Sequence, residues 1–156
     1  MTSKPEGQTR SLIGYRYCEE DLQPGYVEHA AGDHLPELSP DKQKAEVVIR
    51  RGDKRGVLRA QAIFVFEKFE VAARLLNETT GKHLFELSID PRDVFHRADL
   101  RIYDEIVRAL QKGEKVNQLV RQFWEGVQRA DPRIELCVAN RQEGGRCKSF
   151  RETENG

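Results

Sequence analysis

The most constraining feature of the sequence is a helical repeat of apolar residues in its last third. These residues follow the i, i+3, i+4, i+7, i+8, i+11 spacing of one helix face and are Val116, Leu119, Val120, Phe123, Trp124 and Val127. A stripe of this kind has to be buried against another element. A second stripe precedes it and consists of Leu100, Tyr103, Ile106, Val107 and Leu110. The sequence therefore predicts two consecutive helices that help to close a hydrophobic core.

Short runs of β-branched and aromatic residues predict strands in the rest of the chain. The predicted strands span residues 12–18, 62–66, 83–90 and 134–138. Two further helices are predicted, one from the Ser39 N-cap to about Arg51 and one over residues 68–79. Because strands and helices do not alternate as regular βαβ units, the predicted fold class is α+β.

The length of 156 residues corresponds to one domain. We expect a disordered leader at residues 1–10, a single α+β domain at 11–150 and a mobile tail at 151–156. The beginning of the sequence has no apolar run that could serve as a secretory signal, so the expected location is cytoplasmic. A mean hydropathy of −0.70 makes a membrane partner unexpected.

Cysteine and histidine spacing predicts neither disulfides nor metal ligation. The three cysteines are Cys18, Cys137 and Cys147, an odd number without CxxC spacing, and none is paired with a histidine at zinc-ligand spacing. The phosphate-binding and hydrolase motifs GxxxxGK[ST], GxGxxG, GxSxG and HExxH are absent from the sequence. No metal is expected, and no motif by itself identifies an enzyme.

Charge is balanced overall but unevenly distributed. Lysine plus arginine and aspartate plus glutamate both number 26, which argues against a globally basic nucleic-acid binder. Residues 19–37 contain acids but no lysine or arginine, whereas residues 41–59 contain seven basic residues and three acids. Two solvated faces, packed against each other, are the simpler interpretation; a basic wall for phosphates is the functional one.

Four segments carry a resemblance to a known superfamily. They are Tyr15-Arg16-Tyr17 followed by Asp21-Leu22-Gln23-Pro24-Gly25, the run 62–67 leading into 69–73, the strand 83–87, and Phe123-Trp124-Glu125-Gly126 followed by Ile134-Glu135-Leu136. By pattern rather than by identity, they resemble the ADP-ribosyltransferase superfamily, in particular its small rifampin-ADP-ribosyltransferase-like members. The resemblance implies a small, mostly antiparallel two-sheet core with flanking helices.

This resemblance also implies an activity and site residues. NAD would be the substrate, and ADP-ribose would pass to an unknown acceptor that is a protein, a nucleic acid or a small molecule. The resemblance places Glu135 as the catalytic carboxylate, a residue type that stabilises the cation-like sugar formed when the nicotinamide bond breaks. Arg16 would hold the ribose or a phosphate of NAD. Tyr17 and Phe64 are the candidate aromatic faces for the cationic nicotinamide ring.

Alternatives remain at several of these positions. Asp99 and Glu105 are alternative acids, and Arg16 could instead pair with an acid of residues 19–37. Phe64 stands where the superfamily commonly has a serine or tyrosine hydroxyl, which favours a non-catalytic interaction module of the same fold as the second hypothesis. A nucleic-acid accessory protein that uses the basic segment 42–59 is the third.

Overall fold

The computed structural model describes residues 11–18, 27–28, 33–74, 83–139 and 147–152. Within these ranges, residues 17, 18, 27, 28, 83 and 147–152 are described by their backbone alone. The predicted leader and the end of the predicted tail lie outside the described residues.

The described strands form one antiparallel sheet. They are β1 (Leu12–Cys18), β2 (Val27–Glu28), β3 (Ile63–Phe66), β4 (His83–Ile89), β5 (Val94–Asp99), β6 (Ile134–Val138) and β7 (Cys147–Glu152). Their order across the sheet is β2-β7-β4-β1-β3-β6-β5, and every neighbouring pair is antiparallel. Together with the helices, this sheet confirms the α+β class.

The prediction of two separate sheets is wrong for the described strands, because their ladders are continuous. One ladder is nevertheless very short: β1 pairs with β3 only where Tyr15 faces Phe66, whereas β1 and β4 pair from end to end. The sheet thus has two halves, β2-β7-β4-β1 and β3-β6-β5, that meet at a single pair of residues.

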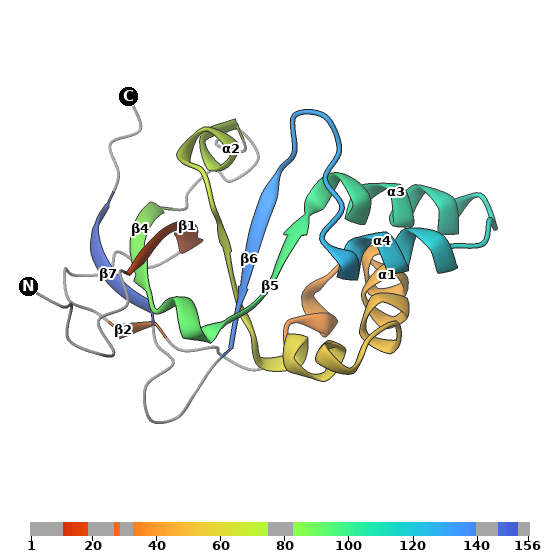
Figure 1. The fold of residues 1–156 in the computed structure, drawn as a ribbon, viewed down its shortest axis with the longest axis horizontal. Helices are drawn as coiled ribbons and strands as arrows, with labels where there is room; N and C mark the ends of the chain where they lie inside the picture. The colour runs from red at the N-terminus through yellow and green to blue at the C-terminus, as the bar shows by residue number, and fades with distance from the viewer. Residues whose placement is uncertain (1–10, 19–26, 29–32, 75–82, 140–146, 153–156) are drawn as a thin grey trace, which may run out of the picture.

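The helices gather beside the β3-β6-β5 half, as Figure 1 shows for α1, α3 and α4. The α-helices are α1 (Pro40–Arg51), α2 (Phe69–Arg74), α3 (Leu100–Gln111) and α4 (Asn117–Glu125), and the 3-10 helices are η1 (Leu35–Glu37), η2 (Lys54–Gln61) and η4 (Pro91–Asp93). The Ser39 side chain accepts a hydrogen bond from the Lys42 N–H at the start of α1, as its predicted N-cap role requires. Each helix of the described residues is too short or too polar to span a membrane.

Two apolar clusters hold the sheet and the helices together. One joins α1, α3 and α4 through the predicted stripes, and it includes Ile49, Ile106 and Phe123. The other lies on one face of the sheet and includes Val65, Phe85 and Leu136. Gly14 permits this second packing, because a Cβ there would lie 2.6 Å from Val65 Cγ2 and 2.7 Å from Ile89 Cδ1.

Most predicted elements occur with nearly the predicted bounds, the strand over residues 134–138 among them. The strand β5, the helix η2 and the short strand β2 were not predicted. Of the helix predicted over residues 68–79, the described part is α2. Strand β7 continues into the predicted tail, as far as Glu152.

Candidate functional site

A cavity of about 470 Å³ lies between the β3–β6 strand pair and helices α1 and α3. We call it the sheet–helix cleft. Its walls are formed by six helices and strands and by the segments that flank them, and most of the lining side chains are aromatic or ionisable: His34, Leu38, Lys42, Glu46, Arg59, Phe64, Phe66, Val71, Leu100, Tyr103, Asp104, Arg133 and Glu135. An aromatic surface with several converging charges is typical of ligand-binding pockets.

Glu135 reaches the cleft because of its register in the sheet. Phe66 pairs with Glu135 across β3 and β6, and Phe64 pairs with Cys137. Paired residues of an antiparallel ladder share a face, so these four side chains lie opposite the apolar cluster around Val65. The alternation of the two strands thus separates an apolar face from a chemically varied one.

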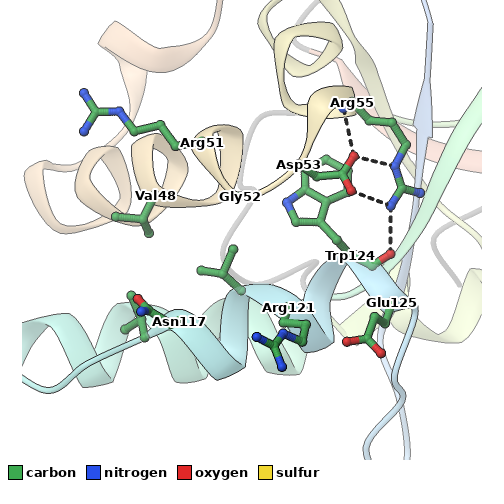
Figure 2. Close-up of a pocket in the computed structure, with 11 residues that line it drawn as sticks. Val48, Arg51, Gly52, Asp53, Arg55, Asn117, Arg121, Trp124 and Glu125 are labelled. Atoms are coloured by element: carbon green, nitrogen blue, oxygen red, sulfur yellow. Dashed lines mark hydrogen bonds and ion pairs between the residues drawn. The ribbon is translucent and has the colours of Figure 1, made fainter.

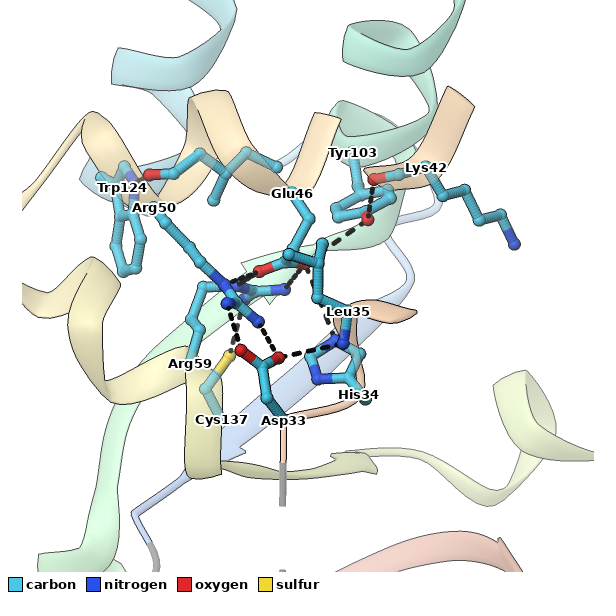
Figure 3. Close-up of polar contacts among 11 residues, drawn as sticks. Asp33, His34, Leu35, Lys42, Glu46, Arg50, Arg59, Tyr103, Trp124 and Cys137 are labelled. Atoms are coloured by element: carbon cyan, nitrogen blue, oxygen red, sulfur yellow. Dashed lines mark hydrogen bonds and ion pairs between the residues drawn. The ribbon is translucent and has the colours of Figure 1, made fainter. Parts of the chain in front are cut away.

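A buried ion pair forms the floor of the cleft (Figure 3). Arg59 Nε donates to Glu46 Oε2 at 2.6 Å, and Arg59 NH2 donates to Glu46 Oε1 at 2.9 Å. Only 1% of Glu46 and 2% of Arg59 is exposed. Burial alone would raise the pKa of the Glu46 carboxyl, but the hydrogen bonds from Arg59 and Arg50 hold that pKa well below its usual range. The pair is therefore ionised and fixed in geometry.

Arg59 is further fixed by two aromatic rings. Its guanidinium carbon lies 4.8 Å from the Phe64 ring centroid and 5.4 Å from that of Phe123. Helix η2 brings Arg59 here by packing closely on α1 at Gly56, where a Cβ would lie 1.9 Å from the Arg50 carbonyl oxygen. Arg59 NH1 also contacts the Cys137 Sγ at 3.5 Å, and burial raises the pKa of that thiol to about 12. Cys137 is therefore an unreactive packing partner of Arg59.

The segment before α1 covers one side of the cleft. The Asp33 carboxylate accepts two 2.9 Å hydrogen bonds from Arg50, whose Nε also donates to Glu46 at 3.0 Å. Hydrogen bonds from Arg50 and from the Leu35 N–H lower the pKa of Asp33 to about 2. This contact joins the acidic and basic segments, in line with the simpler interpretation of the charge asymmetry.

The lining of the cleft also includes a hydroxyl group and two cations. The Tyr103 hydroxyl lies 3.4 Å from both the Lys42 carbonyl oxygen and Glu46 Oε1, and burial raises its pKa above the ordinary value, so it stays protonated. Lys42 and Arg133 also line the cleft. Within the described part of the chain, neither of their side chains has an ion-pair partner. Both cations are thus available to an anionic ligand.

Glu135 has an unusual proton affinity. Burial raises its pKa from 4.5 to about 7, and the negative charge of Glu46 acts in the same direction. The positive charges of Arg59, His34 and Arg16 lower it, but by less than burial raises it. The Glu135 carboxyl therefore gains or loses its proton near neutral pH.

Arg16 approaches the cleft from the other sheet half. Arg16 pairs with Phe85 in the β1–β4 ladder, so its side chain leaves the backbone on the apolar face of the sheet. Glu135 lies on the other face. Arg16 NH1 donates to the Phe64 carbonyl oxygen at 3.3 Å, beyond the point where the β1–β3 ladder ends. Arg16 thus bridges the two sheet halves and acts on Glu135 through its charge, although it does not line the cavity.

The two predicted aromatic residues differ in outcome. Phe64 lines the cleft, but Arg59 lies over its ring and His34 meets it edge-on with a centroid distance of 4.8 Å. Phe66 also lines the cleft and directly faces Glu135 in the ladder. The backbone of Tyr17 pairs with Leu84, and its side chain lies outside the described part of the structure.

The alternative acids have structural partners elsewhere. Asp99 is 1% exposed and caps α3, accepting hydrogen bonds from the backbone N–H groups of Arg101, Arg129 and Arg133. Glu105 forms an ion pair with Arg129 at 2.7 Å. Neither residue lines the cleft, whereas Glu135 does.

Sequence reasoning missed Glu46, Arg59 and Tyr103. One signal was present, because Glu46 lies between Ala45 and Ile49 on the buried stripe of α1. A charged residue in such a stripe indicates a buried partner. In the described residues, no three histidine, cysteine or acidic side chains are grouped as a metal-binding set. No known protein-family model matches the chain, and no curated protein shows significant sequence similarity to it.

Proposed function

We propose that the chain is an ADP-ribosyltransferase-like enzyme that cleaves NAD in the sheet–helix cleft and transfers ADP-ribose to an acceptor nucleophile. The observation that carries the proposal is the position of Glu135. This carboxyl group lies on a strand, beside an aromatic residue and within a cleft whose lining includes cations. The sequence around Arg16, Phe64 and Glu135 resembles that of the superfamily, and this resemblance is the second support for the proposal.

The cleft has a group for each part of the substrate. Lys42 and Arg133 bind the pyrophosphate of NAD, since both are cations without an ion pair in the described residues. The ring of Phe66 packs against the cationic nicotinamide, because the Phe64 ring is already covered by Arg59. The Tyr103 hydroxyl offers lone pairs and a proton to the ribose hydroxyls.

In the chemical step, the bond between the ribose carbon and the nicotinamide nitrogen breaks. Its electron pair stays with the nicotinamide, which leaves as a neutral molecule. The ionised Glu135 stabilises the positive charge that develops on the sugar. The acceptor then bonds to the same ribose carbon and loses its proton.

The pKa of Glu135 gives the reaction a pH dependence. Only the ionised carboxyl stabilises the cation, so kcat/KM for nicotinamide release should rise with pH around an apparent pKa of about 7. The bound nicotinamide cation favours the ionised form and should move the kcat profile to lower pH.

The test is to incubate the protein with NAD labelled in its nicotinamide and to measure release of the label. Glu135→Gln should stop release while NAD still raises the melting temperature by mass action. Glu105→Gln is the matched control, because Glu105 lies outside the cleft and should leave release unchanged. No thermal shift at millimolar NAD, together with no nicotinamide release, would contradict the proposal.

The non-catalytic interaction module is the second candidate function. It is favoured by the phenylalanines at positions 64 and 66, which give β3 no hydroxyl group in the cleft. Binding of NAD without any release of nicotinamide would support it over the enzyme. The nucleic-acid hypothesis loses support, because Arg50, Arg55 and Arg59 of the basic segment are each ion-paired with a carboxylate.

A further inference from the structure

A second cavity of about 500 Å³ lies between α1 and α4, and we call it the α1–α4 groove (Figure 2). It uses a different face of α1 from the sheet–helix cleft. Val48 and Arg51 line the groove, whereas Lys42 and Glu46 line the cleft. The two cavities therefore share a helix but no lining residue.

The floor of the groove is apolar. It is formed by Val48 of α1 and by three residues at or along α4, namely Val116, Val120 and Trp124. In Figure 2, the labelled Val48 extends from α1 toward the space above α4. The Trp124 indole is 5% exposed and is fixed there: its Nε1 donates to the Ile49 carbonyl oxygen at 2.8 Å, and the Arg55 guanidinium carbon lies 4.9 Å from its ring centroid. An ordered apolar floor of this kind accommodates the body of an organic ligand.

The charges at the edges of the groove are unequal. Asp53 is neutralised by Arg55, with Nε–Oδ1 and NH2–Oδ2 distances of 2.8 and 3.1 Å. Arg51 on α1 and Arg121 on α4 are exposed, and within the described residues neither has an ion pair or a side-chain hydrogen bond. Glu125 is the remaining acid of the lining. Positive charge thus exceeds negative charge around the groove.

These two arginines differ from the third arginine that lines the groove. Arg55 is held by Asp53 and also donates to the Trp124 carbonyl oxygen at 3.0 Å. Guanidinium groups that are free of carboxylates are available to bind phosphate or carboxylate oxygens. The Asn117 side chain, also in the lining, adds a neutral donor and acceptor.

We propose that the α1–α4 groove is a second binding site, for a small organic anion that joins one phosphate or carboxylate group to a planar apolar body. The apolar body packs on Val48 and Val120 beside the buried Trp124, and the anionic group contacts Arg121 or Arg51. A cavity volume of about 500 Å³ suits a small molecule of this kind. The site is separate from the proposed NAD cleft and does not depend on NAD chemistry.

The chain provides its own reporter for this site. Trp124 is the single tryptophan, so its indole N–H gives one identifiable NMR signal from the floor of the groove. The probes are naphthyl phosphate, naphthoate and uncharged naphthol, titrated into the folded protein. We expect both anions to shift the indole signal, and naphthol to bind at least about fivefold more weakly because it lacks the charge. Comparing the phosphate with the carboxylate distinguishes the two sources of anion.

Variants distinguish binding in the groove from nonspecific attraction by surface charge. Arg121→Gln should weaken naphthyl phosphate binding about fivefold or more, since it removes one charge-assisted contact. Arg108→Gln is the matched control, an exposed arginine on α3 outside the groove, and should have no effect. Val48→Phe should fill the groove and abolish binding, with a thermal melt confirming that the variant is folded.

Three results would overturn the proposal. The indole signal could stay fixed at millimolar concentrations of both anions. Naphthol could bind as tightly as naphthyl phosphate, which would remove the role of charge. Arg121→Gln and Arg108→Gln could weaken binding equally, which would reduce the effect to nonspecific attraction by the surface.

Discussion

The two faces of the β3–β6 strand pair have opposite characters although they alternate residue by residue. One face carries Ile63, Val65, Leu136 and Val138, all at most 2% exposed and surrounded by other apolar side chains. The other face carries Phe64, Phe66, Glu135 and Cys137, which border the sheet–helix cleft and its ion pair. The comparison teaches that one ladder can supply stability on one side and reactive groups on the other, because the register keeps them apart.

The largest effect should come from breaking the ion pair on the cleft side. Glu46→Ala leaves the Arg59 guanidinium buried without its carboxylate, so the free energy of unfolding should fall by about 3–5 kcal/mol. Urea denaturation measures this. The double variant Glu46→Ala, Arg59→Met should recover much of the loss, because no charge then remains buried. A loss below about 1 kcal/mol for the single variant would show that Arg59 finds another partner or water.

A substitution on the apolar face of the β3–β6 strand pair should lower stability through lost packing alone. Leu136→Ala creates a cavity on the face opposite the cleft and should lower the free energy of unfolding by about 2–5 kcal/mol. Nicotinamide release per folded molecule should stay unchanged, because Leu136 belongs to the apolar cluster and does not line the cleft. Measuring both quantities on one preparation tests the separation of the two faces. A loss of release in fully folded Leu136→Ala would show that the faces are coupled.

Glu135 should make stability fall as pH rises. Its pKa is raised from 4.5 to about 7 in the folded state, so the folded protein holds a proton that the unfolded chain has already released between these values. The free energy of unfolding should therefore decrease by at most about 3.5 kcal/mol across this window and level off above it. Glu135→Gln should remove this dependence, as urea denaturation at several pH values can show. An unchanged slope would mean that another group causes it.

The smallest effect should come from the exposed contact beside the cleft. Asp33→Asn removes the charge that binds Arg50, and because the Asp33 side chain is 41% exposed, the cost should be at most about 1 kcal/mol. The effect should shrink further in high salt, since exposed pairs are screened. A salt-independent loss of several kcal/mol would show that this contact is as important as the buried pair.

Local signals in the sequence were sufficient for many of the elements. The Ser39 N-cap and the stripes of α3 and α4 depend on neighbouring residues, and their elements occur as predicted. Strand β5 was missed, because its polar residues His96 and Arg97 interrupt the apolar pattern that predicts a strand. The strand forms because its backbone pairs with β6. The continuity of the sheet was missed for a similar reason, since it depends on one long-range pair.

The candidate site was predictable only in its strand residues. Glu135 and Phe64 follow from the strand pattern and the resemblance, and both line the cleft. The partners that tune them come from α1, η2 and α3, and their contacts join distant parts of the chain, such as Tyr103 with Glu46. No periodicity records such a contact, because it is created by helix packing and not by neighbouring residues.

The single β1–β3 pair has a mechanical consequence. With so few backbone hydrogen bonds at this junction, the two sheet halves are joined mainly by side chains. Val65 of β3 packs over Gly14 of β1 within the apolar cluster that also contains Phe85 of β4, and the Arg16 guanidinium donates across the junction to the Phe64 carbonyl oxygen. The stiffness of the sheet at this point is therefore set by side-chain packing, and resizing those side chains changes it without removing a backbone hydrogen bond.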